Sequence, residues 1–138
     1  MKLKDRIKII ERNKIIDSRG WFLKVITGKE EYLPQFTGEV YLISANSGEN
    51  RANHYHNEAN EWFTLVQGKA EMIIEDIETK ERIILQLDSE KPLTVYIPHH
   101  IAHAFNNLSD IPYILVTYTD RLFSPKDTIS YSWYNHNK

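Results

Sequence analysis

The chain has 138 residues, of which 41% are apolar and 26% are charged, and its formal net charge is −2. This length is enough for one domain with a core and too short for two, so we expect residues 1–138 to form a single domain. The small negative charge argues against a nucleic acid or an anionic membrane as a partner, and no stretch reaches the ~20 apolar residues of a membrane span.

The first residues are charged and are not followed by the apolar segment of a signal peptide. We therefore expect a cytoplasmic enzyme or binding protein. Because the chain has no cysteine, any metal must be held by nitrogen and oxygen atoms.

Short strands are the elements that the sequence predicts. The charged segment 1–16 is expected to be a strand or an arm. Segments rich in β-branched and aromatic residues then predict strands at 21–26, 39–44, 62–66, 71–75, 82–87, 94–97 and 113–118. Turn-forming residues separate them at intervals of about ten residues, which is typical of an all-β barrel or sandwich. We expect Trp62, Phe63 and Phe105 in the core, and a loose tail over 134–138.

Histidines and a glutamate recur at informative spacings. His54 and His56 are two residues apart, so on one strand they share a face. Glu61 lies at an odd offset from His54, which would put it on the opposite face of an unbroken strand. The polar segment 57–60 is expected to turn and reset this phase, so that a new strand begins at Glu61. Joined by His103 from a distant strand, these side chains suit a divalent first-row metal.

Both segments resemble the motifs of cupins. The first runs from Gly48 to Gly68 with H-x-H and Glu at the motif spacing, and the second matches at Pro98, His103 and Asn107. Two family glycines are replaced, by Pro92 and His100. The resemblance implies an all-β, single-domain cupin jelly-roll barrel with a metal on His54, His56, Glu61 and His103. Its register favours Glu61 over the alternative carboxylate, Glu58.

A narrower resemblance, to sugar-nucleotide cupins, covers the chain from Ile15 to Trp133. Segments 17–22, 51–55, 102–110 and 119–125 are similar to the D-x-R-G-x-F, R-G-x-H-Y, A-H-G-F and T-D-x-x-x-P elements of dTDP-4-dehydrorhamnose 3,5-epimerases. Those enzymes use no metal and carry Gln at His56 and Lys near Glu61. The chain is more similar to the cupin domain of bifunctional capsular polysaccharide enzymes, which binds zinc and epimerises a 4-keto nucleotide sugar.

The resemblance implies an epimerase or isomerase that acts through an enolate on a nucleotide-linked 4-keto-6-deoxy sugar in cell-surface polysaccharide biosynthesis. Zinc is the expected cofactor, with iron, manganese and nickel as alternatives. His54 matches the family's general base, but a lone pair that binds metal cannot also take a proton. The other candidate proton carriers are His100 and Tyr118. The candidate substrate-binding residues are Arg19, Arg51 and Asn53.

Three other functions remain open at this point. Many cupins with three histidines and one glutamate are metal-dependent oxygenases, and a related branch of sugar cupins moves the ketone instead of inverting a centre. A non-catalytic module that binds metal or sugar beside a reductase is the third. The edge strands of a small barrel also predict a homodimer, because pairing would protect them.

Overall fold

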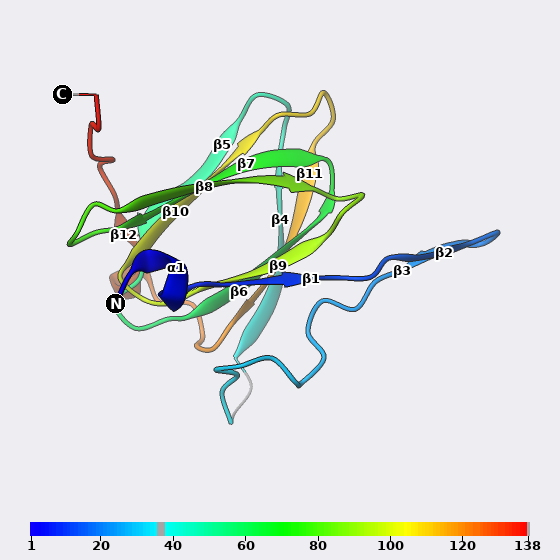
Figure 1. Ribbon diagram of the computed structural model, residues 1–138, viewed down its shortest axis with the longest axis horizontal. Coiled ribbons are helices and arrows are strands. Elements are labelled where there is room, and N and C mark those ends of the chain that lie inside the picture. Colours follow the sequence, from blue (N-terminus) through cyan, green and yellow to red (C-terminus); the bar gives the residue numbers. More distant parts are fainter. Residues whose placement is uncertain (36–37, 138) are drawn as a thin grey trace.

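The computed structural model describes residues 1–35 and 38–137, which form two facing five-stranded antiparallel sheets (Figure 1). The first sheet has the order β1 (Lys8–Glu11), β9 (Leu93–Ile97), β6 (Glu61–Gln67), β11 (Tyr113–Thr119) and β4 (Glu39–Ala45). The second has the order β12 (Ile129–Ser130), β5 (Asn50–Tyr55), β10 (Ile101–Asn107), β7 (Lys69–Asp76) and β8 (Arg82–Asp88). The all-β, jelly-roll architecture predicted from the sequence is confirmed.

Three smaller elements complete the described chain. A four-residue helix, α1 (Leu3–Arg6), precedes β1, and a 3₁₀ turn, Pro125–Asp127, precedes β12. Strands β2 (Ile15–Asp17) and β3 (Gly20–Phe22) pair only with each other and form a hairpin that projects from the barrel (Figure 1). Among the described residues, no helix is long and apolar enough to cross a membrane.

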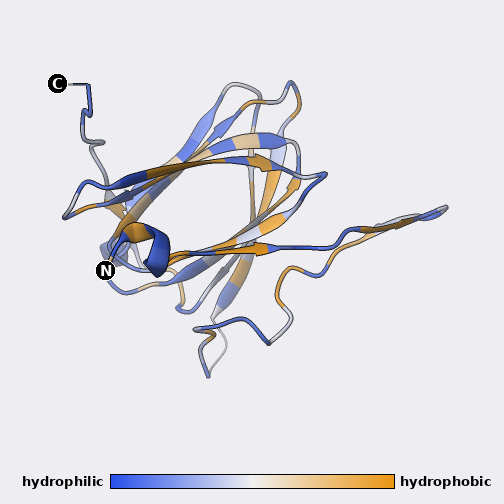
Figure 2. Cartoon of the chain, viewed as in Figure 1, coloured by the Kyte–Doolittle hydropathy of each residue, from blue (hydrophilic) through white to orange (hydrophobic). Residues whose placement is uncertain are grey.

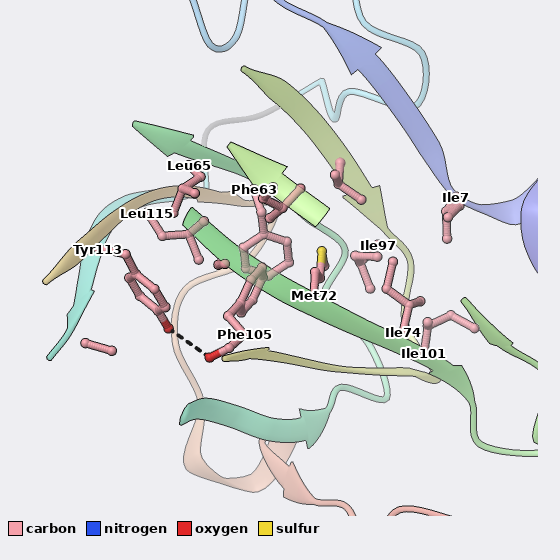
Figure 3. Close-up of a cluster of buried hydrophobic side chains, with 14 of the residues drawn as sticks. Ile7, Phe63, Leu65, Met72, Ile74, Ile97, Ile101, Phe105, Tyr113 and Leu115 are labelled. Atoms are coloured by element: carbon pink, nitrogen blue, oxygen red, sulfur yellow. Dashed lines mark hydrogen bonds between the residues drawn. The ribbon is translucent and has the colours of Figure 1, made fainter. Parts of the chain in front are cut away.

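The core fills the space between the two sheets because side chains alternate along each strand. Phe63 and Leu65 of β6 face Met72 of β7 and Phe105 of β10, and all four are buried (Figure 3). The hydroxyl of Tyr113 donates to the Phe105 carbonyl at 3.4 Å. Burying each large apolar side chain stabilises the fold by about 1.5–3 kcal/mol.

Phe63 and Phe105 therefore lie in the core, as expected, whereas Trp62 is buried elsewhere. Trp62 is 1% exposed, but it lies one residue from Phe63 and so on the outer face of the first sheet. There it packs against Tyr96 and Tyr118, with ring centroids 4.8 and 5.4 Å away.

The strand predicted at 21–26 ends at Phe22, and the chain continues as a loop. Two polar side chains hold this loop out of any sheet. The Glu30 carboxylate accepts the backbone N–H groups of Thr27 and Gly28 at 2.8 and 3.0 Å. The Arg12 guanidinium donates to Glu30 at 2.6 Å and to the Val25 carbonyl at 2.9 Å. The strand propensity of residues 23–26 is therefore overruled by the contacts of the Arg12–Glu30 ion pair, whose side chains are 10% and 3% exposed.

The tail that was expected to be loose from residue 134 is held as far as His136. Glu75 is completely buried and accepts the Tyr134 backbone N–H at 3.2 Å. The His136 ring lies 3.0 Å from the same carboxylate. A buried carboxylate needs donors, and the tail supplies them. Lys138 lies outside the described residues.

Candidate metal centre

The turn between β5 and β6 sets the relative phase of the H-x-H pair and the glutamate. Strand β5 ends at Tyr55, segment 57–60 turns, and β6 begins at Glu61, as the spacing predicts. Asp120 holds the end of the turn, accepting the backbone and side-chain N–H groups of Asn60 at 2.9 and 2.8 Å. Glu61 thus enters the barrel interior rather than the outer face.

A β-bulge in β5 changes the phase on the other side of the histidines. Ala52 and Asn53 have φ values of 87° and 55°, and the register between β5 and β10 shifts there. His54 pairs with His103, while Arg51 pairs with Phe105, two residues further along β10. Paired residues face the same side, so the extra residue puts Arg51 on the same face as His54 although they are three apart.

Four potential ligands converge inside the barrel. One donor atom each from His54, His56, Glu61 and His103 lies within 4.8 Å of all the others. Glu61 Oε1 is 2.8 Å from His56 Nε2 and 3.5 Å from His103 Nε2. Glu61 and His103 are buried, and the two other histidines are half-buried. The structure thus brings together the four residues that the sequence singled out: β5, β6 and β10 supply His54, Glu61 and His103, and His56 follows β5 directly.

Hydrogen bonds fix which ring nitrogens face the cluster. The Nδ1 atom of His56 lies 2.8 Å from the Asp127 carbonyl, and Nδ1 of His103 lies 3.2 Å from the Ile101 carbonyl. A carbonyl only accepts, so both Nδ1 atoms carry the proton and each Nε2 presents a lone pair. In the part of the chain that is described, both Nε2 atoms and Glu61 Oε1 are buried without a hydrogen-bond partner.

These orphaned acceptors fit a divalent cation. Three lone-pair donors face one another across short distances. A single proton on His56 Nε2 would satisfy only that atom and Glu61 Oε1 and would leave His103 Nε2 unpaired, whereas a metal ion would satisfy all three. The donor set of imidazoles and one carboxylate is of the kind that zinc and other first-row metals take.

Burial and charge set the protonation of the cluster. Burial lowers the pKa of His103 to about 4. Burial and the neighbouring His56 lower the pKa of His54. Burial also acts to lower the pKa of His56, but the Glu61 carboxylate outweighs it and the net shift is upward. Burial acts to raise the pKa of Glu61, but its neighbours His56, His103 and Tyr41 outweigh burial, and the net shift of the pKa is downward. Glu61 is therefore ionised at neutral pH.

Tyr41 is a residue of the site that sequence reasoning misses. Its hydroxyl donates to Glu61 Oε2 at 2.8 Å, which leaves Oε1 to face the histidines. Burial and the Glu61 charge raise the pKa of Tyr41, so the hydroxyl keeps its proton. The sequence carries no signal for it, because residues 40–43 are all apolar or aromatic and the exposed residues of β4 include Val40 and Leu42. A small cleft beside this pair is lined by Glu39, Tyr41, His56, Ala59, Glu61, Thr119, Arg121, Leu122, Phe123, Ser124, Asp127 and Thr128.

The predicted proton carriers His100 and Tyr118 are not placed in this cluster. His100 occupies a family glycine position, and its φ of 67° is the backbone conformation that glycine usually supplies. Its ring stacks edge-on against His99, 4.8 Å away. Tyr118 packs on Trp62 outside the barrel, because the inner face of β11 carries its neighbours Thr117 and Thr119.

The predicted substrate-binding residues are dispersed. Arg51 is exposed on β5, on the face it shares with His54. The side chain of Asn53 is hydrogen-bonded within the protein: its oxygen accepts the Trp133 indole N–H at 2.9 Å, and its amide donates to Asn50. Arg19 lies on the projecting hairpin, where it pairs with Asp17 at 2.6 Å and is 87% exposed.

The fold and the arrangement of strands around this cluster define the class of protein, a cupin with a single jelly-roll barrel. The model of the polysaccharide biosynthesis C-terminal domain family matches residues 15–131, and the chain belongs to that family.

Among curated proteins, the chain is similar to the spore coat polysaccharide biosynthesis protein SpsL of Bacillus subtilis, with 24% identity over 94% of this chain and 95% of that protein. The fold is similar to that of a dTDP sugar isomerase from Desulfovibrio desulfuricans, with a TM-score of 0.83, 16% identity, and coverage of 92% of this chain and 84% of that one. The capsular polysaccharide assembling protein CapF from Staphylococcus aureus has 25% identity and a TM-score of 0.66. That match covers 88% of this chain and 34% of CapF, so this chain spans about a third of CapF.

Proposed function

We propose that the protein is an epimerase or isomerase of a nucleotide-linked 4-keto-6-deoxy sugar in polysaccharide biosynthesis, with a divalent metal at the four-residue cluster. The observation that carries the proposal is the convergence of His54, His56, Glu61 and His103 inside a barrel of this family. The names of the similar proteins, which include a dTDP sugar isomerase and CapF, agree with sugar chemistry in polysaccharide assembly.

Zinc is the metal we propose, held by these three histidines and the glutamate. When bound, such a cation would supply Lewis-acid polarisation of a ketone or acidify a bound water. The protein's own groups prepare the site: Tyr41 orients the Glu61 carboxylate, and burial keeps His103 neutral. The lowered pKa of His54 leaves its lone pair free at neutral pH, for the metal or, where the metal is absent, for a carbon-bound proton.

The substrate would approach along the face that carries Arg51 and His54. An arginine is suited to a diphosphate because its guanidinium offers paired donors. Arg51 is the predicted residue best placed for this role, since it shares a face with the cluster. Arg19 lies on the hairpin, which projects from the barrel (Figure 1), so its part in substrate binding would depend on where the hairpin docks.

Proton exchange tests this function. The dTDP- and UDP-linked 4-keto-6-deoxy sugars are incubated with zinc-loaded protein in D₂O, and the C3 and C5 proton signals are followed by NMR. We expect at least one of these signals to disappear, because enolisation exchanges the proton beside the ketone. Loss of exchange when a chelator removes the metal would assign the metal a part in it. No exchange with either nucleotide would contradict the proposal and favour an oxygenase or a binding module.

Two variants sharpen the same assay. His103→Ala removes a buried ligand and should abolish metal binding and metal-dependent exchange together. His100→Gly removes the imidazole but suits the left-handed backbone at that position. Because the His100 ring stacks on His99 outside the cluster, we expect His100→Gly to retain exchange. A loss of exchange in this variant would instead support His100 as a proton carrier.

A further inference from the structure

Strand β5, which carries His54 and ends immediately before His56, would be an edge strand without the C-terminal segment. In the second sheet β5 lies between β10 and β12, and β12 has only two residues. Those two residues pair with Tyr55 and His54, and the next backbone N–H, that of Tyr131, donates to the Asn53 carbonyl at 2.8 Å. The C-terminal segment therefore contacts the ligand strand at the ligands themselves.

We propose that the C-terminal segment 127–136 is a positioning strap for the metal centre, acting through Asp127 at His56 and through Trp133 at the bulge beside His54. The inference rests on the proposed metal centre and adds residues that touch neither metal nor substrate.

Asp127 organises the ligand turn from one point. Its carboxylate accepts three successive backbone N–H groups, those of Asn57, Glu58 and Ala59, at 2.8, 3.0 and 3.0 Å. Its carbonyl accepts the Nδ1 proton of His56 at 2.8 Å. One residue thus fixes both the turn that places Glu61 and the ring orientation of His56. Outer contacts of this kind orient metal ligands and commonly govern affinity.

Trp133 secures the opposite end of the ligand pair. Its indole N–H donates to the Asn53 side chain at 2.9 Å, and Asn53 is the left-handed residue of the bulge immediately before His54. A left-handed non-glycine residue persists only where its surroundings hold it. The Trp133 contact supplies such a restraint and so fixes the direction in which His54 leaves the strand.

The end of the strap is anchored at Glu75. This buried carboxylate accepts the Tyr131 hydroxyl at 2.5 Å and the Tyr134 backbone N–H at 3.2 Å. Arg82 joins the anchor, donating to Glu75 at 2.8 Å and to the Tyr134 carbonyl at 2.7 Å. The family model ends at residue 131, so Trp133, Tyr134 and His136 extend the strap beyond the matched segment.

Zinc affinity tests the strap. The dissociation constant for zinc is measured by competition with a chromophoric chelator for wild type, Asp127→Asn and Trp133→Phe. Asp127→Asn replaces one of the carboxylate oxygens that accept the three backbone N–H groups by an amide group, which donates. Trp133→Phe keeps an aromatic ring but removes the N–H that donates to Asn53. We expect each variant to bind zinc about 10–100-fold more weakly, the range for loss of contacts that orient ligands.

Matched controls separate positioning from general destabilisation. Asp88→Asn changes a carboxylate that caps the Glu90 N–H in a turn distant from the cluster, and Trp21→Phe removes an indole N–H on the hairpin. Both should bind zinc as wild type does. Urea unfolding of the metal-free proteins is measured in parallel, because a purely structural role would shift that midpoint and leave the zinc affinity of the folded protein unchanged.

The outcomes distinguish the inference from the proposed function. Weaker zinc binding by the strap variants with unchanged controls supports the strap. Wild-type affinity in both strap variants would overturn the strap alone. A wild-type protein that binds no zinc would overturn the metal centre and the strap with it.

Discussion

The four side chains of the proposed metal centre do not compete equally for protons, and this difference can be measured. The pKa of His56 is raised above 6.5, while the pKa values of His54 and His103 are lowered, the last to about 4. As the pH falls, His56 is therefore the first imidazole to gain a proton and lose its lone pair. Glu61, with its lowered pKa, stays ionised over the same interval.

We therefore expect zinc binding to show a one-proton dependence at pH values below the raised pKa of His56. The dissociation constant should rise about tenfold per pH unit as the pH falls below the pKa of His56, because metal and proton exclude each other on one nitrogen. Chelator competition at a series of pH values, corrected for protonation of the chelator, measures this slope. A slope of two or three protons in that interval would show that the histidines titrate together.

The members of the four-residue cluster could be predicted from the sequence, but the orientation of their side chains could not. Spacing alone brought His54, His56 and Glu61 to one face, because the strand period and one polar turn settle the geometry. The Nδ1 proton of His56 depends on the carbonyl of Asp127, 71 residues away, and no local pattern reveals that contact. Tyr41 carried no motif, and the continuous apolar run of residues 40–43 does not show which side chains of β4 face inward.

At the level of elements, the bulge in β5 shows why the family pattern has a glycine at a position where this chain does not. The R-G-x-H-Y element of related enzymes has a glycine where this chain has Ala52, and Ala52 has a φ of 87°. Likewise, His100 replaces a family glycine at a φ of 67°. Both family glycines therefore match backbone conformations that side chains disfavour. Sequence reasoning noted the replacement of glycine by His100 and assigned its imidazole a role, whereas the motif position mainly required a conformation.

Ala52→Gly should consequently stabilise the protein. Relief of left-handed strain contributes about 1–2 kcal/mol, and the greater freedom of glycine in the unfolded chain offsets about 0.5–1 kcal/mol of it. We expect the free energy of unfolding to rise by about 0.5–1 kcal/mol, measured by urea denaturation. Ala104, the pairing partner of Ala52 in regular strand β10, provides the control, and Ala104→Gly should destabilise. Destabilisation by both changes would show that Ala52 is not strained.

At the scale of the whole molecule, the hairpin is the part of the fold that the barrel does not explain. Ile15, Ile16, Trp21 and Phe22 are 54–68% exposed, although they are the apolar residues of β2 and β3 (Figure 2). Among the described residues, the hairpin strands pair with each other and with no further strand. Exposed apolar side chains gathered on one projecting element are typical of an interaction surface. The outer face of edge strand β4 offers a second apolar surface, with Val40 and Leu42 63% and 68% exposed.

We expect these surfaces to meet in a homodimer, in which the hairpin of each copy packs on the other. Sedimentation should then give a mass of about 33 kDa, twice the 16.3 kDa of one chain. The double variant Ile16→Glu/Phe22→Glu should sediment as a monomer with an unchanged circular dichroism spectrum, because charges on the hairpin would be desolvated at the interface but not in the free chain. Ile84→Glu, at a residue 51% exposed on β8, is the matched control and should remain dimeric. A wild-type mass near that of one chain would contradict the dimer, and a dimer that survives both hairpin charges would place the interface elsewhere.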